Sequence, residues 1–193
     1  MAATTMNAQK ESMPKILFMV GSLRAASASK AMALSMAELL ADEAEIAFAD
    51  IGTLPHYNAD TLDNPQVAAL NEAIRSADGL VFVTPEYNYS IPGLLKNAID
   101  WASRPAYNSV FVNKPCFVIS VSGGALGGVR AQSHLKYILN GMLAVVFPSL
   151  EVVVPHANDK IADGRIADQA ILSFGRARLV AFIDFVRGQA KAA

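Results

Sequence analysis

The chain has 193 residues, 53% of which are hydrophobic, and its formal net charge at pH 7 is -1. This near balance of charge excludes the basic surface that binding to nucleic acid or to an anionic membrane requires. The most apolar region, residues 142–154, contains Pro148 and Glu151 and is too short to span a membrane. We therefore expect one domain with a large buried core, and neither nucleic acid nor a membrane as its partner.

The N-terminal residues and the cysteine count bear on the cellular compartment. Residues 1–13 are polar and lack the apolar stretch of a secretory signal, so we interpret them as a disordered tail before a single domain at 14–193. Cys116 is the only cysteine, which excludes an intrachain disulfide. The 3 histidines are far apart and show no metal-ligand spacing. We expect a cytoplasmic protein without a metal site.

Apolar runs alternate along the chain with segments of helical periodicity. The runs are too short for helices and rich in β-branched and aromatic residues, which is typical of strands buried on both faces. They cover residues 15–20, 45–49, 79–84 and 116–121, and a last one lies within 143–154. Strands and helices in alternation predict an α/β fold, a doubly wound parallel sheet with helices on both faces.

Each helical segment has one apolar face, because its apolar residues recur every three or four positions. In the third segment Ser90 can cap the free N–H groups and Pro92 suits the first helical turn. The last segment covers about residues 167–186. The predicted inner faces are Ala33, Met36 and Leu40; Val67, Leu70 and Ile74; Leu94, Leu95, Ala98, Ile99 and Ala102; Leu135, Ile138 and Met142; and Leu172, Leu179, Ile183 and Val186.

The loop after the first strand has the composition of an anion site. It reads GSLRAASASK, from Gly21 to Lys30, and leads into a helix. Its hydroxyls, the Arg24 guanidinium and the free N–H groups of the helix all favour negative charge, so a phosphate is the expected ligand. The loop matches neither the P-loop pattern nor the glycine pattern of dinucleotide-binding folds. A serine-rich helix cap beside an exposed arginine is the alternative interpretation.

The loop after the third strand carries more chemistry than a connection needs. It contains Pro85, Glu86, Tyr87, Asn88 and Tyr89. Tyrosine offers flat faces with polar tips, and asparagine offers both a donor and an acceptor, a combination that suits a planar heteroaromatic ligand. We expect Glu86 to accept hydrogen bonds that hold the loop in place, rather than to transfer a proton. An ordinary turn at the start of a helix is the alternative.

The loop after the fourth strand, residues 122–128, has a glycine at Gly123, Gly124, Gly127 and Gly128. Such a loop lets the backbone approach a ligand closely, although it can also be a flexible connection and nothing more. In a flavodoxin-like sheet of strand order 2-1-3-4-5, the loops after strands one, three and four meet where the strand order reverses, and such sheets bind ligands there. One loop would hold a phosphate, one a flat ring and one the polar edge of that ring.

Three segments carry a resemblance to a known family: GSLRAASASK, PEYNYSIPGLLKNAIDW and SGGALGGVRAQ, in this order. Together they resemble the NADPH-dependent FMN reductases, a family that includes quinone, chromate and azo reductases. The resemblance extends from about residue 15 to residue 186 and implies a five-stranded flavodoxin-like sheet. It also implies a homodimer or homotetramer in which a neighbouring subunit closes over the flavin.

The resemblance implies an FMN site, residue by residue. The phosphate would be bound by Ser22, Arg24 and Ser27, with Ser29 or Lys30 nearby, although many relatives have asparagine where this chain has Lys30. Ser122, Gly123 and Gly124 would contact the pyrimidine edge of the ring. The ribityl chain and the isoalloxazine ring would lie against Pro85, Glu86, Tyr87, Asn88, Tyr89 and Ser90.

The implied function is that of an FMN-dependent NAD(P)H oxidoreductase. The cofactor, and no protein side chain, would transfer the hydride from NADPH or NADH to quinones, flavins, azo compounds or oxidised metals such as chromate. The alternative is a flavodoxin-like electron carrier without turnover of its own. Carriers of that kind have an acidic docking surface, which 17 acidic against 16 basic residues do not supply. A receiver-type signalling domain would need an aspartate after the third strand, where this chain has Thr84, Pro85 and Glu86.

Overall fold

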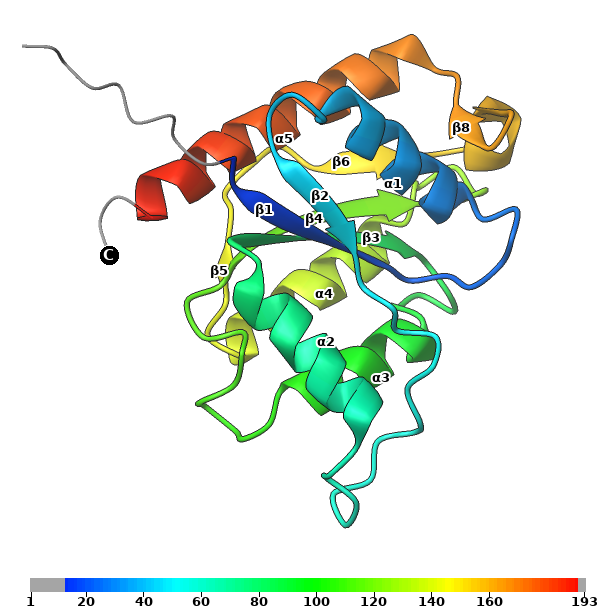
Figure 1. The fold of residues 1–193 in the computed structure, drawn as a ribbon. Helices are drawn as coiled ribbons and strands as arrows, with labels where there is room; N and C mark the ends of the chain where they lie inside the picture. Colours follow the sequence, from blue (N-terminus) through cyan, green and yellow to red (C-terminus); the bar gives the residue numbers. More distant parts are fainter. Residues whose placement is uncertain (1–12, 191–193) are drawn as a thin grey trace, which may run out of the picture.

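The computed structural model describes residues 13–190, and the predicted disordered tail lies almost entirely outside them. A parallel sheet forms the middle of three layers (Figure 1). Its strands follow the order β2-β1-β3-β4-β5, which confirms the predicted order 2-1-3-4-5. The strands are β1 (Lys15–Val20), β2 (Glu45–Phe48), β3 (Gly79–Pro85), β4 (Pro115–Val121), β5 (Val145–Val146) and β6 (Val152–Val154).

The fifth position of the sheet is filled by two short strands rather than one. β5 pairs with the first residues of β4, at Pro115 and Cys116. β6 pairs with the last three, from Ile119 to Val121. Pro148 lies between the two segments, and because proline has no N–H it interrupts the hydrogen-bond ladder. The five predicted positions of the sheet are confirmed, and within residues 13–190 the fifth position is divided between two strands, which makes six strands.

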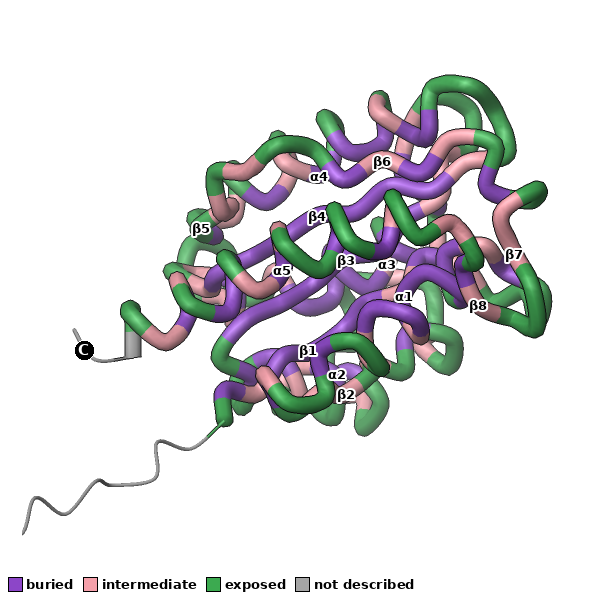
Figure 2. The backbone as a smooth tube through the Cα atoms, turned by 90° about the horizontal axis from the view of Figure 1, so that it is seen from above, coloured by how far each residue is buried: buried purple, intermediate pink, exposed green. Residues whose placement is uncertain are grey.

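Helices cover both faces of the sheet, as predicted. Helices α1 and α5 lie on one face, and α2, α3 and α4 lie on the other (Figure 1). The central strands lie inside and are buried (Figure 2). The helices are α1 (Ala28–Leu39), α2 (Pro65–Ser76), α3 (Gly93–Ala102), α4 (Val129–Gly141) and α5 (Gln169–Ala190).

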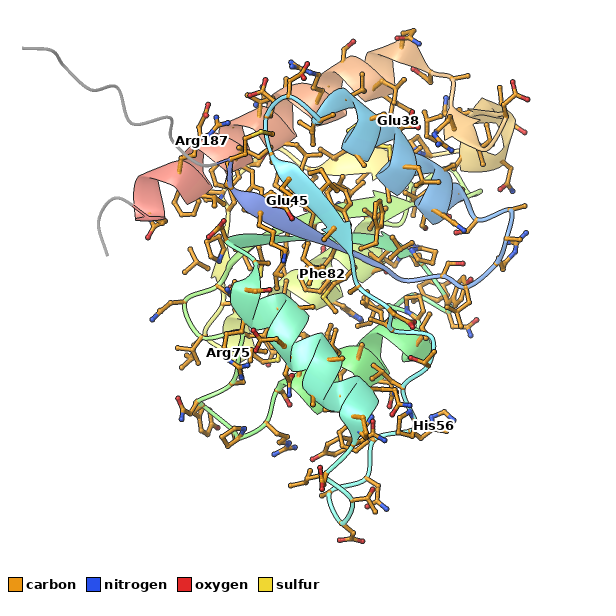
Figure 3. All side chains as sticks on the ribbon, in the orientation of Figure 1. Glu38, Glu45, His56, Arg75, Phe82 and Arg187 are labelled. Atoms are coloured by element: carbon orange, nitrogen blue, oxygen red, sulfur yellow. The ribbon has the colours of Figure 1, made fainter. Side chains whose placement is uncertain are left out.

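Alternate residues of each strand supply the two halves of the core. Ile16 and Phe18 of β1 pack with α1 and α5, whereas Leu17 and Met19 pack with the helices of the opposite face. Phe82 of β3, labelled in Figure 3, also packs with the helices of that opposite face. Most of the predicted helix positions are buried, and only Leu94, Ile138 and Met142 are half-buried.

The last third of the chain adds two details to the predicted elements. The segment before α5 contains a 3-10 helix, η1 (Ala157–Lys160), and an antiparallel hairpin of β7 (Ile161–Ala162) and β8 (Arg165–Ile166) that the sequence pattern did not indicate. α5 begins at Gln169 rather than at 167, because Asp168 precedes it and its Oδ1 accepts from the N–H groups of Ala170 and Ile171, each at 3.1 Å.

The described part of the chain bears on two further predictions and on the state of Cys116. None of its helices is long and apolar enough to cross a membrane. Its His, Cys, Asp and Glu side chains form no cluster of three or more that could hold a metal ion. Cys116 is buried in β4, and burial raises the pKa of its thiol well above the usual range, which fits a structural thiol.

Candidate functional site

A small pocket of about 130 Å³ lies where the loops after β1, β3 and β4 meet. These loops leave neighbouring strands at their carboxyl ends, so the predicted convergence of the three motifs is confirmed. Asn158 of η1 also lines the pocket and had not been predicted, because η1 follows the fifth strand position. The lining residues are Ser22, Arg24, Ser27, Ala28, Ser29, Pro85, Glu86, Tyr87, Val121, Ser122, Gly123 and Asn158.

The β1–α1 loop supplies hydroxyls and one guanidinium to this pocket. Ser27 and Ser29 are buried, Ser22 is half-buried and Arg24 is exposed. Ser27 caps α1, its Oγ accepting from the N–H of Lys30 at 3.3 Å. The loop is tied to β3, because the N–H of Gly21 donates to the carbonyl oxygen of Val83 at 2.9 Å. This donor set suits an anion with several oxygens, such as a phosphate.

The β3–α3 loop forms a tight two-residue turn. The N–H of Tyr87 donates to the carbonyl oxygen of Ser90 at 2.9 Å, and the reverse bond is 3.1 Å. Asn88 and Tyr89 between them have positive φ values of 48° and 68°. This left-handed conformation is unfavourable for a tyrosine, and such local strain clusters at functional sites. The turn leaves Tyr87, Asn88 and Tyr89 exposed next to the pocket.

The prediction that Ser90 caps the third helix is wrong. α3 begins at Gly93, after Pro92, and has no side-chain cap. Ser90 Oγ instead shares a hydrogen bond of 3.0 Å with Nδ1 of His134 on α4. Ser90 cannot serve as the cap because its backbone closes the turn with Tyr87, three residues before the helix starts at Gly93.

Glu86 holds the turn against the first turn of α4. Its Oε2 accepts from the N–H groups of Arg130 at 3.1 Å and Ala131 at 3.4 Å, and its Oε1 accepts from Arg130 Nη1 at 3.2 Å. A carboxylate at a helix N-terminus also interacts favourably with the helix dipole. The expectation that Glu86 holds the loop in place is confirmed. Because its charge faces α4 and Arg130, Glu86 lines the pocket without presenting a free negative charge to an anion.

The glycine-rich loop after β4 divides into two parts. Gly127 and Gly128 have φ values of 59° and 85°, and a side chain at Gly127 would lie 3.0 Å from the backbone nitrogen of Pro155, so both serve the fold. Gly123 and Gly124 are exposed. The N–H of Gly124 donates to Ser122 Oγ at 3.1 Å, which shapes the part of the loop that faces the pocket.

The structure does not bring all the predicted site residues to one place. Gly124 and the turn residues Asn88, Tyr89 and Ser90 lie beside the pocket without lining it. Lys30 lines a separate, larger cavity, which shares Ser27 and Asn158 with the pocket. The remaining nine predicted residues line the pocket: Ser22, Arg24, Ser27, Ser29, Pro85, Glu86, Tyr87, Ser122 and Gly123.

The long β2–α2 loop is packed on α3 and does not line the pocket. The carbonyl oxygen of Pro55 accepts from Asn97 Nδ2 at 2.9 Å and from Trp101 Nε1 at 2.7 Å. The N–H of Tyr57 donates to Asn97 Oδ1 at 2.8 Å. His56 is exposed on this loop (Figure 3). These contacts hold the loop in place against α3, while its start at Gly52 lies beside Leu23 of the β1–α1 loop.

Known proteins are similar to this chain in both sequence and fold. The sequence profile of the family described as NADPH-dependent FMN reductase matches residues 14–159. A 2-hydroxy-1,4-benzoquinone reductase of a Burkholderia species is 44% identical over 158 residues, covering 80% of this chain and 86% of that protein. An NAD(P)H-dependent FMN reductase of Pseudomonas aeruginosa is 38% identical over 177 residues, covering 90% of this chain and 95% of that protein.

A solved structure agrees with these sequence matches. FerB, a flavoenzyme NAD(P)H:(acceptor) oxidoreductase from Paracoccus denitrificans, superposes with a TM-score of 0.83 at 35% identity, over 91% of this chain and 98% of that one. The matched residues include all three motif loops around the pocket. The chain therefore belongs to the NADPH-dependent FMN reductase family, whose members are oxidoreductases that use FMN and NAD(P)H.

Proposed function

We propose that this enzyme uses FMN bound at the three loops to pass electrons from NADPH or NADH to small acceptors, with quinones as the first class to examine. Relatives named for quinone reduction support this choice, because they match most of the chain at 37 to 44% identity. Free flavins, azo compounds and oxidised metals such as chromate are further acceptors in the proposal. The observation that carries it is the hydroxyl-lined, arginine-flanked pocket directly beside the strained tyrosine turn.

The residues present fit FMN. A pocket of about 130 Å³ is large enough for a phosphate and too small for a whole flavin. Ser22, Ser27 and Ser29 offer hydroxyl donors, and Arg24 offers the positive charge that a phosphate dianion needs. When bound, FMN supplies the hydride chemistry, so no side chain has to act as a nucleophile or base.

In this proposal the turn and the glycine loop orient the flat ring. Tyr87 and Asn88 present an aromatic face and an amide on one side, and Gly123 and Gly124 present backbone along one edge. One face of the site then stays open. Since that face admits one flat ring at a time, the donor must leave before the acceptor enters.

The assembly in this proposal is a homodimer or homotetramer in the cytoplasm, formed by the domain at 14–193. Support comes from large apolar side chains on the surface, since exposed apolar area beyond the usual scatter marks interaction surfaces. Tyr137 of α4 is 82% exposed and Leu150, before β6, is 67% exposed. Tyr89 of the ring-facing turn is 68% exposed, and a neighbouring subunit that covers it would also exclude water from the site.

The test is a steady-state assay of the purified, FMN-loaded protein. NADPH and NADH serve as donors, and the acceptor panel contains benzoquinones, free FMN, an azo dye and chromate. The proposal expects turnover with at least the quinones and without any partner protein. A protein that binds FMN but passes electrons only to another protein would instead be the electron carrier, and a protein that binds no flavin would contradict the site assignment.

A further inference from the structure

One wall of the pocket at the motif loops comes from none of those loops. Asn158 of η1 lines this pocket, and it also lines the larger cavity of about 550 Å³ between α1 and the β7–β8 hairpin, two elements that lie side by side (Figure 1, Figure 2). Of the described lining residues, only Asn158 and Ser27, the N-cap of α1, border both spaces. Asn158 therefore lies at the α1 end of the pocket, beside the groups that suit a phosphate.

The backbone of η1 is fastened to the glycine loop after β4. The N–H of Ala157 donates to the carbonyl oxygen of Ser122 at 2.9 Å, and the N–H of His156 donates to that of Gly124 at 3.2 Å. Ala157 is also fully buried. Because these contacts hold Asn158 in place through the backbone, an exchange of its side chain should leave the walls of the pocket intact.

The Asn158 carboxamide lies against Gly123. A Cβ added to Gly123 would be 2.8 Å from Asn158 Nδ2, so the amide occupies the space that a side chain there would need. Asn158 is exposed, and within residues 13–190 no protein group forms a hydrogen bond with its side chain. Since a carboxamide has two N–H donors and one acceptor oxygen, Asn158 can donate to a ligand without losing a contact to the protein.

We propose that Asn158 is a specificity-determining residue of the flavin site, whose Nδ2 donates a hydrogen bond to the phosphate of FMN. The inference rests on the proposed function, because it requires FMN with its phosphate in this pocket. A phosphate group has three oxygens that are strong hydrogen-bond acceptors. The β1–α1 loop supplies hydroxyl and guanidinium donors for them, and Asn158 adds a donor from η1. Riboflavin lacks the phosphate, so this contact favours FMN over riboflavin.

Asn158→Asp separates this role from simple packing. Aspartate has nearly the shape of asparagine, so the contact with Gly123 stays, but a negative carboxylate replaces the N–H donors. A carboxylate repels a phosphate and has no such effect on riboflavin. Asn158→Ala removes the donor without adding charge. A residue that only packs would tolerate the exchange for aspartate better than the exchange for alanine, and a contact with phosphate reverses this order.

The test uses Asn158→Asp and Asn158→Ala, with Asn140→Asp as the matched control. Asn140 is exposed near the end of α4 and lines neither the pocket nor the larger cavity, and its exchange changes the net charge by the same amount. FMN and riboflavin are titrated into each protein after removal of its own flavin, with flavin fluorescence as the signal. Turnover with NADPH and a benzoquinone is then measured at rising FMN concentration.

The proposal expects Asn158→Ala to weaken the binding of FMN about tenfold and Asn158→Asp about a hundredfold, while the binding of riboflavin stays unchanged. Asn140→Asp should affect neither flavin, and saturating FMN should restore the turnover of both Asn158 variants. An equal loss for the two flavins, or an Asn158→Asp protein that binds FMN as tightly as the original does, would overturn the proposal. An original protein that binds FMN without any turnover would sink the proposed function, while the titrations would still decide the role of Asn158.

Discussion

The guanidinium of Arg130 lies over the ring of Tyr89, with 4.6 Å between Cζ and the ring centroid. The same guanidinium donates to Glu86, so one side chain of α4 contacts both ends of the ring-facing turn. Asn88 and Tyr89, the two residues in the left-handed conformation, belong to the segment that these contacts hold. Arg130 thus holds a strained turn in the arrangement that the proposed flavin ring requires.

Replacing Arg130 with Met should loosen this turn without unfolding α4. The backbone N–H groups that donate to Glu86 remain in the variant, so only the cation–π contact and the ion pair between the exposed Arg130 and the half-buried Glu86 are lost. These are each worth about 0.5–1 kcal/mol, so the affinity for flavin should fall by at most roughly five- to thirtyfold if both are lost in full. Fluorescence titration measures the affinity.

Arg130→Met should weaken the binding of FMN and of riboflavin by the same factor, because the turn faces the ring that both flavins share. Arg130→Lys keeps a cation near Glu86, so its affinity for flavin should lie between those of the original protein and Arg130→Met. A loss confined to FMN would show that Arg130 acts on the phosphate, which contradicts the role given to it here.

Glu86 should contribute to stability as a helix cap supplied by another loop. Glu86→Ala removes the acceptor of the Arg130 and Ala131 N–H groups and should lower the free energy of unfolding by about 1–2 kcal/mol. Glu86→Gln keeps one acceptor oxygen and should cost less than about 1 kcal/mol. Urea unfolding of the FMN-free proteins measures both, and equal losses in the two variants would argue against a capping role.

Arg24→Ala should weaken the binding of FMN without weakening the binding of riboflavin. The loss of one charge-assisted contact to the phosphate corresponds to roughly a tenfold to hundredfold change in affinity. Saturating FMN should restore most of the turnover, since the phosphate is remote from the reacting ring. Flavin titrations and rates at rising FMN concentration decide this, and a variant that stays inactive when fully loaded would show that the phosphate site is misplaced.

The contrasting variant is Asn88→Gly. Glycine tolerates the positive φ of this position, so the variant removes the amide without adding the strain that alanine would bring. We expect a defect in turnover that added FMN does not cure, because the loss concerns the ring and not the phosphate. Rates measured on the fully loaded variant test this, and full recovery would remove Asn88 from the site.

The arrangement of the three loops follows from features that sequence periodicity reports well. Short apolar runs and helices in alternation specify a parallel sheet, and a parallel sheet brings its strand ends to one edge. Glycines in a row and a Pro-Glu-Tyr-Asn-Tyr stretch at those ends are visible without a structure. For these reasons Ser22, Pro85 and Gly123 could be predicted to lie together.

Other parts of the site depend on contacts between distant positions. The local sequence predicts Ser90 as a helix cap because capping depends on neighbouring residues, whereas its actual partner, His134, is 44 residues away. Asn158 reaches the pocket from a short 3-10 helix, and Lys30 lines a separate cavity together with Arg165 of the two-residue strand β8. Elements this short leave no periodic pattern. The break at Pro148 was visible in the sequence, but a strand that resumes after it was not.

The central claim is that donor and acceptor use one open face of the site in turn. It is tested most directly by initial rates with NADPH and a benzoquinone varied together on the FMN-loaded enzyme. Our account predicts parallel lines in the double-reciprocal plot, the pattern of a mechanism in which the first product leaves before the second substrate binds. Intersecting lines would contradict it, because they would show that both substrates occupy the site together.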